Sequence, residues 1–209
     1  MMIQVDEKHP SWIRWTHWVN FPLLSVMIWS GILIYWANPS ESPPFFPKSF
    51  YEVLGLKQRL AEGMAYHLTL MWVFALNGFL YLVYTLGSGY WRALWPSALD
   101  WRNLPRVVLH DLGIRKSTVP QGKFNAAQKI SYCGVLFMGV LSVITGIAIH
   151  KPVQASFIAG LLGSYETARR IHFYLTLGYV AFFGIHVLQV ARAGWNNFRS
   201  MVTGWEIRS

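Results

Sequence analysis

The chain has 209 residues, of which 54% are hydrophobic and only 13% are charged. An ordinary soluble domain carries about 25% charged residues, so this composition argues against a soluble domain and predicts an integral membrane protein. The net charge of +9 fits nucleic acid or anionic lipid, but in a membrane protein the basic excess belongs in cytoplasmic loops, so no nucleic acid is expected as a partner. The single cysteine, Cys133, can neither form an intrachain disulfide nor bind an iron–sulfur cluster alone, and is expected to be a small helix-packing residue.

Four apolar segments are long enough to cross a bilayer, which takes about 20 mostly apolar residues per helix. They predict membrane-spanning helices at about residues 15–37, 64–86, 128–149 and 171–193. The fold class is therefore all-α, a single membrane four-helix bundle domain over residues 1–209. The first apolar segment is too long for a cleavable signal peptide and is expected to be retained.

The segments between the predicted spans are polar and rich in proline or tryptophan. The first loop, NPSESPPFFPKSF, cannot continue a helix, because its prolines lack the backbone donor. A short interfacial helix is expected after it, at Tyr51–Leu60. The second loop, about residues 87–127, mixes tryptophan with arginine as expected at a membrane surface, and its length predicts a functional or partner-facing segment.

Basic residues are distributed unevenly between the two sides of the predicted bundle. Twelve of the 18 basic residues lie on the side of the two termini and of the second loop. By the positive-inside rule both termini are cytoplasmic, with the chain in a bacterial cytoplasmic (inner) membrane together with its lipid. The six on the other side are Lys48, Lys57, Arg59, Lys151, Arg169 and Arg170.

Four of the seven histidines fall within or at the edge of predicted spans: His17, His67, His172 and His186. Ionisable residues inside a membrane are costly and usually functional. The last two are 14 residues apart on one helix, which is about 3.9 turns and about 21 Å of rise, so they share a face at two different depths.

The direction of each helix then pairs the histidines by depth. His67 pairs with His172, and His17 pairs with His186, whichever way the protein is inserted. Two facing imidazoles at one depth suit an iron porphyrin, whereas zinc would need three or four clustered ligands. The chain has no CxxCH motif for covalent haem attachment. The sequence thus predicts two haem b groups, with these four histidines as iron ligands.

The remaining histidines are expected to have no ligand role. His150, at the end of the third span, is predicted to be interfacial, and His9 and His110 in polar segments are predicted to be solvated. One glycine lies in the middle of each span, where it allows either close helix packing or space for a flat macrocycle. These glycines are Gly31, Gly78, Gly146 and Gly178.

Four motifs carry a resemblance to a known family: RWTHW in the first span, YH opening the second, GKFNAAQK before the third, and RRIHFYLTLGYVAFFGIHV in the fourth. Over almost its whole length the chain resembles the di-haem cytochrome b subunits of membrane-bound formate dehydrogenase, thiosulfate reductase and nickel–iron hydrogenase. The resemblance implies a haem-bearing membrane anchor for an iron–sulfur electron-transfer subunit and an extracytoplasmic catalytic subunit, often with molybdopterin. It also implies electron exchange with a quinone, menaquinone or ubiquinone.

The same resemblance places the quinone site near the cytoplasmic haem, where Asn125 and Gln128 fall, flanked by Lys123 and Lys129. The structural alternative for these residues is a helix N-terminal cap with lysines on the cytoplasmic side.

The expected function is electron transfer without substrate chemistry other than at quinone, as a subunit of an oxidoreductase complex. The alternative is a stand-alone enzyme similar to the superoxide-oxidising di-haem cytochromes b, that is, a superoxide:quinone oxidoreductase. A third alternative is a transporter or a scaffold without haem.

Overall fold

The structure, a computed structural model, describes residues 4–37, 48–53, 55, 59–114 and 123–208. Most of the proline-rich first loop, at residues 38–47, lies outside this part of the chain. Residues 115–122 of the second loop also lie outside it. Three of the basic residues counted for the orientation are therefore not described: Lys57, Arg115 and Lys116.

Four long helices form the body of the protein. They are α1 (Ser11–Tyr35), α3 (Leu60–Gly87), α6 (Ala126–His150) and α8 (Tyr165–Thr203). Each is long and apolar enough to cross a membrane, which confirms the predicted all-α membrane bundle. Helices α3, α6 and α8 extend beyond their predicted spans at both ends, whereas α1 begins four residues earlier and ends two residues earlier than predicted. The largest extension is in α8, where Gly194, with φ 81°, interrupts the helical backbone one residue after the predicted end.

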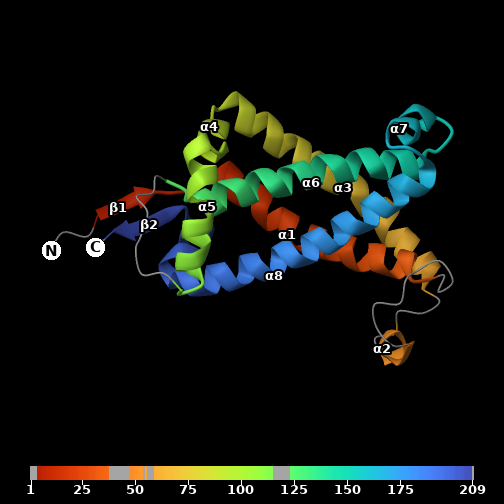
Figure 1. Ribbon diagram of the computed structural model, residues 1–209, viewed down its shortest axis with the longest axis horizontal. Helices are drawn as coiled ribbons and strands as arrows, with labels where there is room; N and C mark the ends of the chain where they lie inside the picture. The colour runs from red at the N-terminus through yellow and green to blue at the C-terminus, as the bar shows by residue number, and fades with distance from the viewer. Residues whose placement is uncertain (1–3, 38–47, 54, 56–58, 115–122, 209) are drawn as a thin grey trace.

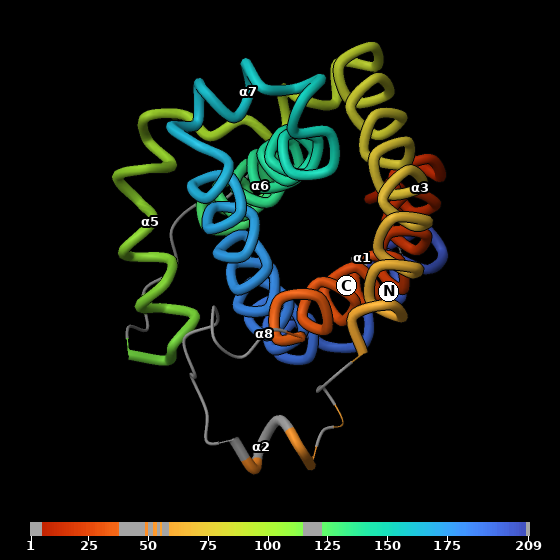
Figure 2. Tube along the Cα trace, turned by 90° about the vertical axis from the view of Figure 1, so that its right-hand side faces the viewer, coloured from red at the N-terminus to blue at the C-terminus, as the bar shows by residue number. Residues whose placement is uncertain are grey.

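The four helices lie side by side, with both termini at the same end (Figure 1). Viewed along the bundle, α3, α1, α8 and α6 follow one another around it (Figure 2). Helix α1 packs against α3 and α8, and α6 packs against α8. Many large apolar side chains on the outer faces are exposed, among them Trp72, Phe79 and Phe137, as expected for surfaces that contact lipid.

The end of the bundle with the termini carries β1 (Gln4–Glu7), β2 (Trp205–Arg208), α4 (Trp91–Leu94) and α5 (Ala98–Asp111), and is called the termini side (Figure 1). The opposite side carries α2 (Lys48–Val53) and α7 (Ser156–Leu161). Helix α2 overlaps only the first three residues of the helix predicted at Tyr51–Leu60, and Leu54 and residues 56–58 lie outside the described chain.

The second loop contains a helix that the apolar pattern did not predict. Helix α5 begins with a capping box, in which Ser97 and Asp100 satisfy each other's backbone N–H groups. The Asp100 carboxylate also lies 3.0 Å from Nζ of Lys129, which ties α5 to the start of α6. Hydrogen bonds from Ser97, together with Lys129, hold the pKa of Asp100 below its usual value.

The two ends of the chain pair with each other as an antiparallel two-stranded sheet. Lys8 Nζ lies 2.8 Å from Oε1 of Glu206, and the backbone N–H groups of Lys8 and His9 donate to the Gly204 carbonyl.

This pairing leaves His9 half-buried, so the prediction that His9 is solvated holds only in part. The His9 ring is stacked on Phe124 at 6.2 Å between ring centroids, and its Nδ1 atom is buried. Burial, together with the positive charges of Lys8 and Lys123, lowers the pKa of His9 to about 4. The sequence could not reveal this burial, because it depends on two strands 200 residues apart.

Candidate functional site

The first pair of histidines lies inside the bundle toward the opposite side. His67 on α3 faces His172 on α8, with 6.1 Å between ring centroids and 76° between ring planes. Both rings are half-buried. The structure thus brings together the two histidines that helix direction had paired.

The second pair lies toward the termini side. His17 on α1 faces His186 on α8, again with 6.1 Å between ring centroids and with 57° between ring planes. The fourth predicted ligand, His186, is also stacked on Phe182, with centroids 5.6 Å apart. Helix α8 therefore supplies one histidine to each layer, as its 14-residue spacing requires.

The spacing of both pairs fits a single metal ion held between two imidazoles. Imidazole nitrogen binds such metals at about 2.0–2.1 Å and lies about 1.2 Å from its ring centre, so two opposed rings have centres about 6.5 Å apart. The observed 6.1 Å in both layers is within about 0.5 Å of this value. In the part of the chain that the structure describes, no three His, Cys, Asp or Glu side chains converge as a metal site, so the ligand set of a zinc centre is not formed there.

A hydroxyl group on a neighbouring helix contacts each histidine of the opposite-side layer. Ser30 Oγ on α1 is 3.0 Å from Nδ1 of His67, and Thr145 Oγ1 on α6 is 2.8 Å from Nδ1 of His172. Both hydroxyls donate to carbonyl oxygens of their own helices, Ser30 to Met27 and Thr145 to residue 141.

The donor and acceptor roles at these contacts depend on the tautomer of each ring. With the hydroxyl protons directed to the carbonyl oxygens, the hydroxyl oxygens accept from the N–H of Nδ1. The lone pair of each ring is then on Nε2, the form in which a neutral imidazole binds iron. A hydrogen bond at Nδ1 also fixes the ring orientation, so Nε2 of each ring could hold a metal.

The termini-side layer is built differently. Within the described residues, Nδ1 of His17 is buried and has no hydrogen-bond partner. Helix α1 is held next to α3 at this depth by Asn77, whose side-chain amide donates to the Thr16 carbonyl at 3.1 Å. The two layers therefore share their ring spacing but differ in the groups that contact the Nδ1 atoms of the rings.

The mid-helix glycines fall into distinct environments. A Cβ atom added at Gly31 would lie 3.5 Å from Cε1 of His67, and one at Gly146 would lie 3.5 Å from Cε1 of His172. These two glycines leave space beside the histidine rings. A Cβ at Gly178 would lie 3.0 Å from Sδ of Met138, so that glycine allows close helix packing, whereas an added Cβ at Gly78 meets no atom within 4 Å.

Comparison with known proteins identifies the family of the chain. A family model described as prokaryotic cytochrome b561 matches residues 8–204. The chain belongs to the prokaryotic cytochrome b561 family. Membership in this family implies haem b and a role as a membrane electron-transfer subunit, which are the coarser parts of the prediction made from the sequence.

This cytochrome b561 chain is also similar to a putative protein-methionine-sulfoxide reductase subunit, YedZ1, from Azospira oryzae. The two are 33% identical over 192 residues, which cover 91% of this chain and 93% of that protein. The similarity therefore includes all four long helices.

The predicted quinone residues form the N-terminal cap of α6 in this cytochrome. Asn125 accepts from the Gln128 backbone N–H at 2.8 Å, and Gln128 accepts from the Asn125 backbone N–H at 2.9 Å. This capping box confirms the cap that the structural alternative predicted. It uses the side-chain oxygens and leaves the amide NH₂ groups outside the box, so a quinone role for these residues remains a prediction.

Of the two flanking lysines, Lys123 lies 5.1 Å from the ring centroid of Tyr90, and Lys129 binds the carboxylate of Asp100.

Sequence reasoning missed the two hydroxyl residues next to the histidines, although a signal for them was present. Ser30 and Thr145 each precede a mid-span glycine in a repeated pattern, SGILI in α1 and TGIAI in α6. The pattern places a hydroxyl group next to a residue without a side chain, and in the structure both positions lie beside a histidine ring.

The remaining residues singled out from the sequence have structural surroundings. The His150 ring lies 6.5 Å from Trp72, measured between centroids, at the opposite-side end of α6. Cys133 is a half-buried free thiol whose Sγ lies 3.5 Å from the Leu94 carbonyl, between α6 and α4. His110 is half-buried beside Asp111, with Nδ1 3.5 Å from its carboxylate, so the prediction that it is solvated holds only in part.

Proposed function

We propose that this cytochrome b561 binds two haem b groups, one between His67 and His172 and one between His17 and His186. Through these centres it would exchange electrons between a membrane quinone and a partner oxidoreductase. The observation that carries the proposal is the presence of two facing histidine pairs, each with ring centroids 6.1 Å apart. When bound, each haem supplies a one-electron redox centre, and the protein supplies ligation, orientation and insulation.

The chain's own residues support a path across the membrane. His172 and His186 lie on one helix with about 21 Å of rise between them, so the two layers lie near opposite membrane surfaces. With the termini in the cytoplasm of a bacterium, as the positive-inside rule favours, the layer at His17 and His186 is cytoplasmic and the other faces outward. Charge moved between the layers then works with or against the membrane potential, at about 2.3 kcal/mol per charge per 100 mV.

The quinone site is proposed at the start of α6 on the cytoplasmic side. The KFNAAQK motif, shared with the formate dehydrogenase and thiosulfate reductase cytochromes that the chain resembles, supports this position. The NH₂ groups of Asn125 and Gln128 would donate to a quinone carbonyl, while their oxygens stay in the capping box.

Two substitutions separate binding from capping. Asn125→Asp and Gln128→Glu both keep an oxygen that can cap the helix but remove the NH₂ donor. Quinone reduction should fall at least tenfold in both variants while the melting temperature stays within a few degrees. Unchanged quinone kinetics would contradict this site and leave the haem proposal intact.

The partner is proposed to lie on the outer face, next to the layer of His67 and His172. The name of the YedZ1 relative, a protein-methionine-sulfoxide reductase subunit, favours a reductase partner and electron flow from quinol outward. The resemblance to dehydrogenase and hydrogenase cytochromes instead favours an iron–sulfur subunit and a molybdopterin-dependent or other catalytic subunit. Co-purification from native membranes distinguishes these partners, and a lone chain that reduces quinone with superoxide would contradict the subunit role.

The haem proposal is tested by removing one histidine at a time. His67→Ala and His172→Ala should each remove the same haem, whereas His17→Ala and His186→Ala should each remove the other, in reduced-minus-oxidised spectra and haem-to-protein ratios. His150→Ala is the matched control, because it removes a histidine at the membrane surface outside both layers. Loss of one common haem in His67→Ala and His186→Ala would contradict the pairing.

A further inference from the structure

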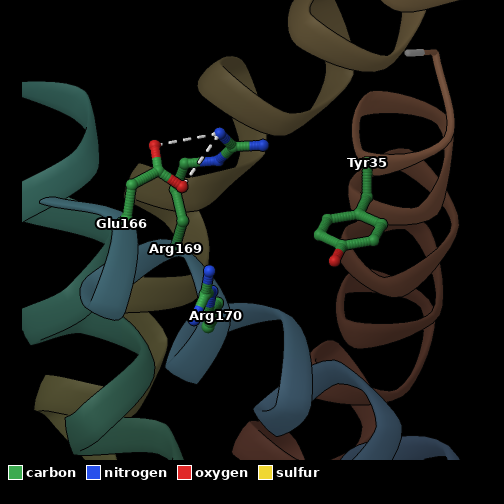
Figure 3. Close-up of a pocket in the computed structure, with 4 residues that line it drawn as sticks. All are labelled: Tyr35, Glu166, Arg169 and Arg170. Carbon is green, nitrogen blue, oxygen red and sulfur yellow. Dashed lines mark hydrogen bonds and ion pairs between the residues drawn. The ribbon is translucent and has the colours of Figure 1, made fainter. Parts of the chain in front are cut away.

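A pocket of about 300 Å³ is present on the opposite side of the bundle. It is lined by Tyr35 at the end of α1 and by Glu166, Arg169 and Arg170 in the first turns of α8. Figure 3 shows Tyr35 projecting from α1 toward Arg170, and Arg169 joined to Glu166. The hydrogen bonds of that pair measure 3.3 and 3.4 Å. With two guanidinium groups and one carboxylate, the described residues of the lining carry a net positive charge.

The pocket lies about one helical turn beyond the layer of His67 and His172. Tyr35 follows Gly31 by four residues on α1, and Arg169 precedes His172 by three on α8. At about 1.5 Å of rise per residue, both side chains start about 5 Å nearer the surface than the layer. The Tyr35 ring is stacked on Phe173 with centroids 3.6 Å apart, which holds α1 and α8 together at this level.

We propose that Arg169 and Arg170 bind the propionate carboxylates of the haem held by His67 and His172, with the Tyr35 hydroxyl as a further donor. This inference rests on the proposed function, because it requires a haem in that layer. Haem b carries its two carboxylates on one edge, and a carboxylate near an apolar layer is costly unless it is paired and hydrogen-bonded. Guanidinium is the side chain best suited to a carboxylate, and its five N–H donors let Arg169 bind Glu166 and a propionate together.

The other layer does not have the same arrangement, although its sequence spacing is identical. Arg14 precedes His17 by three residues, as Arg169 precedes His172. However, Arg14 has no second arginine next to it in the sequence, and its guanidinium also donates to the Val202 carbonyl at the end of α8 at 2.6 Å. A paired-arginine pocket is therefore a property of the opposite-side layer, and removing its charge should affect one haem more than the other.

The test is a redox titration of the purified full-length protein with both haems bound. Ferric haem carries one more positive charge than ferrous haem, so nearby arginines disfavour the ferric state. In Arg170→Gln, and more strongly in Arg169→Gln combined with Arg170→Gln, the ferric-to-ferrous preference of one haem should rise at least tenfold. For a one-electron couple this lowers the midpoint potential by about 59 mV. The affected haem should be the one that His67→Ala removes.

Control variants separate propionate binding from general surface charge. Arg59→Gln removes a positive charge from the same side of the bundle, where Arg59 is bound to Glu62 at 2.6 Å, and should leave both potentials unchanged. Arg170→Lys should restore most of the potential, and Tyr35→Phe should produce a smaller shift in the same direction.

Several results would overturn the inference. An equal shift in Arg59→Gln would mean that surface charge alone is responsible. Unchanged potentials in Arg170→Gln and in the double variant would mean that the arginines bind lipid phosphate or a partner instead. If the double variant loses both haems, the midpoint potentials of the Arg170→Gln variant alone test the inference. A wild-type protein with one haem per chain would instead refute the proposed function, which is measured separately by the haem-to-protein ratio.

Discussion

The hydroxyl group of Thr145 should control the electron affinity of one haem. Its Oγ1 lies 2.8 Å from Nδ1 of His172 and donates its own proton to a carbonyl of α6, so it accepts from the ring N–H. Thr145→Val keeps the shape of the side chain and removes this acceptor. A buried hydrogen bond of this kind contributes a net ~0.5–1.5 kcal/mol.

The direction of the effect follows from the basicity of the imidazole. A hydrogen bond from Nδ1–H makes Nε2 a stronger donor to the metal, which favours the ferric state. Without it, the midpoint potential of the haem between His67 and His172 should rise by about 20–60 mV, the one-electron equivalent of the lost hydrogen bond. The assay is an optical redox titration of the purified protein, with the second haem as an internal reference.

Thr176 provides the matched control for this experiment. Its hydroxyl donates to the backbone carbonyl of His172 at 3.3 Å, so Thr176→Val removes a hydroxyl next to the same histidine without touching the ring. This variant should leave both potentials unchanged. Equal shifts in Thr145→Val and Thr176→Val, or no shift in Thr145→Val, would refute the assigned tautomer and the role of the hydroxyl.

Two further predictions concern stability. In Gly63→Ala the new Cβ would lie 3.0 Å from the backbone carbonyl oxygen of Ser30, so overpacking should cost ~1–3 kcal/mol and lower both the melting temperature and the haem content. Gly78→Ala, where the added atom meets open space, should lower neither. Because the pKa of His9 falls from an ordinary value of 6.5 to about 4 on folding, the unfolded chain binds an extra proton between these values, so stability should fall as the pH drops through this window. His9→Gln should show a smaller loss over that range in thermal unfolding, and an identical pH dependence would contradict the burial of this ring.

Local features of the sequence predicted the membrane bundle and its histidine pairs. Each of the four apolar runs of bilayer length forms a helix in lipid, because a helix satisfies its backbone hydrogen bonds internally. The pairing then followed from helix direction and from the 14-residue spacing of His172 and His186, because neither depends on how the helices pack. This is why His67 and His17 could be assigned to opposite layers without coordinates.

Other features required the tertiary structure, because they depend on which helix faces lie next to each other. The order of the helices around the bundle, and therefore the contacts of Ser30 with His67 and of Thr145 with His172, cannot be derived from any single segment. Nor can the burial of His9, which follows from the pairing of the two chain ends. The sequence by itself determined the number of spans and the depth of each histidine, because length and helical rise are local quantities. Only the tertiary structure decided which hydroxyl group contacts each histidine ring. A hydrogen bond between two helices depends on how each helix is rotated about its axis and on how closely the helices pack.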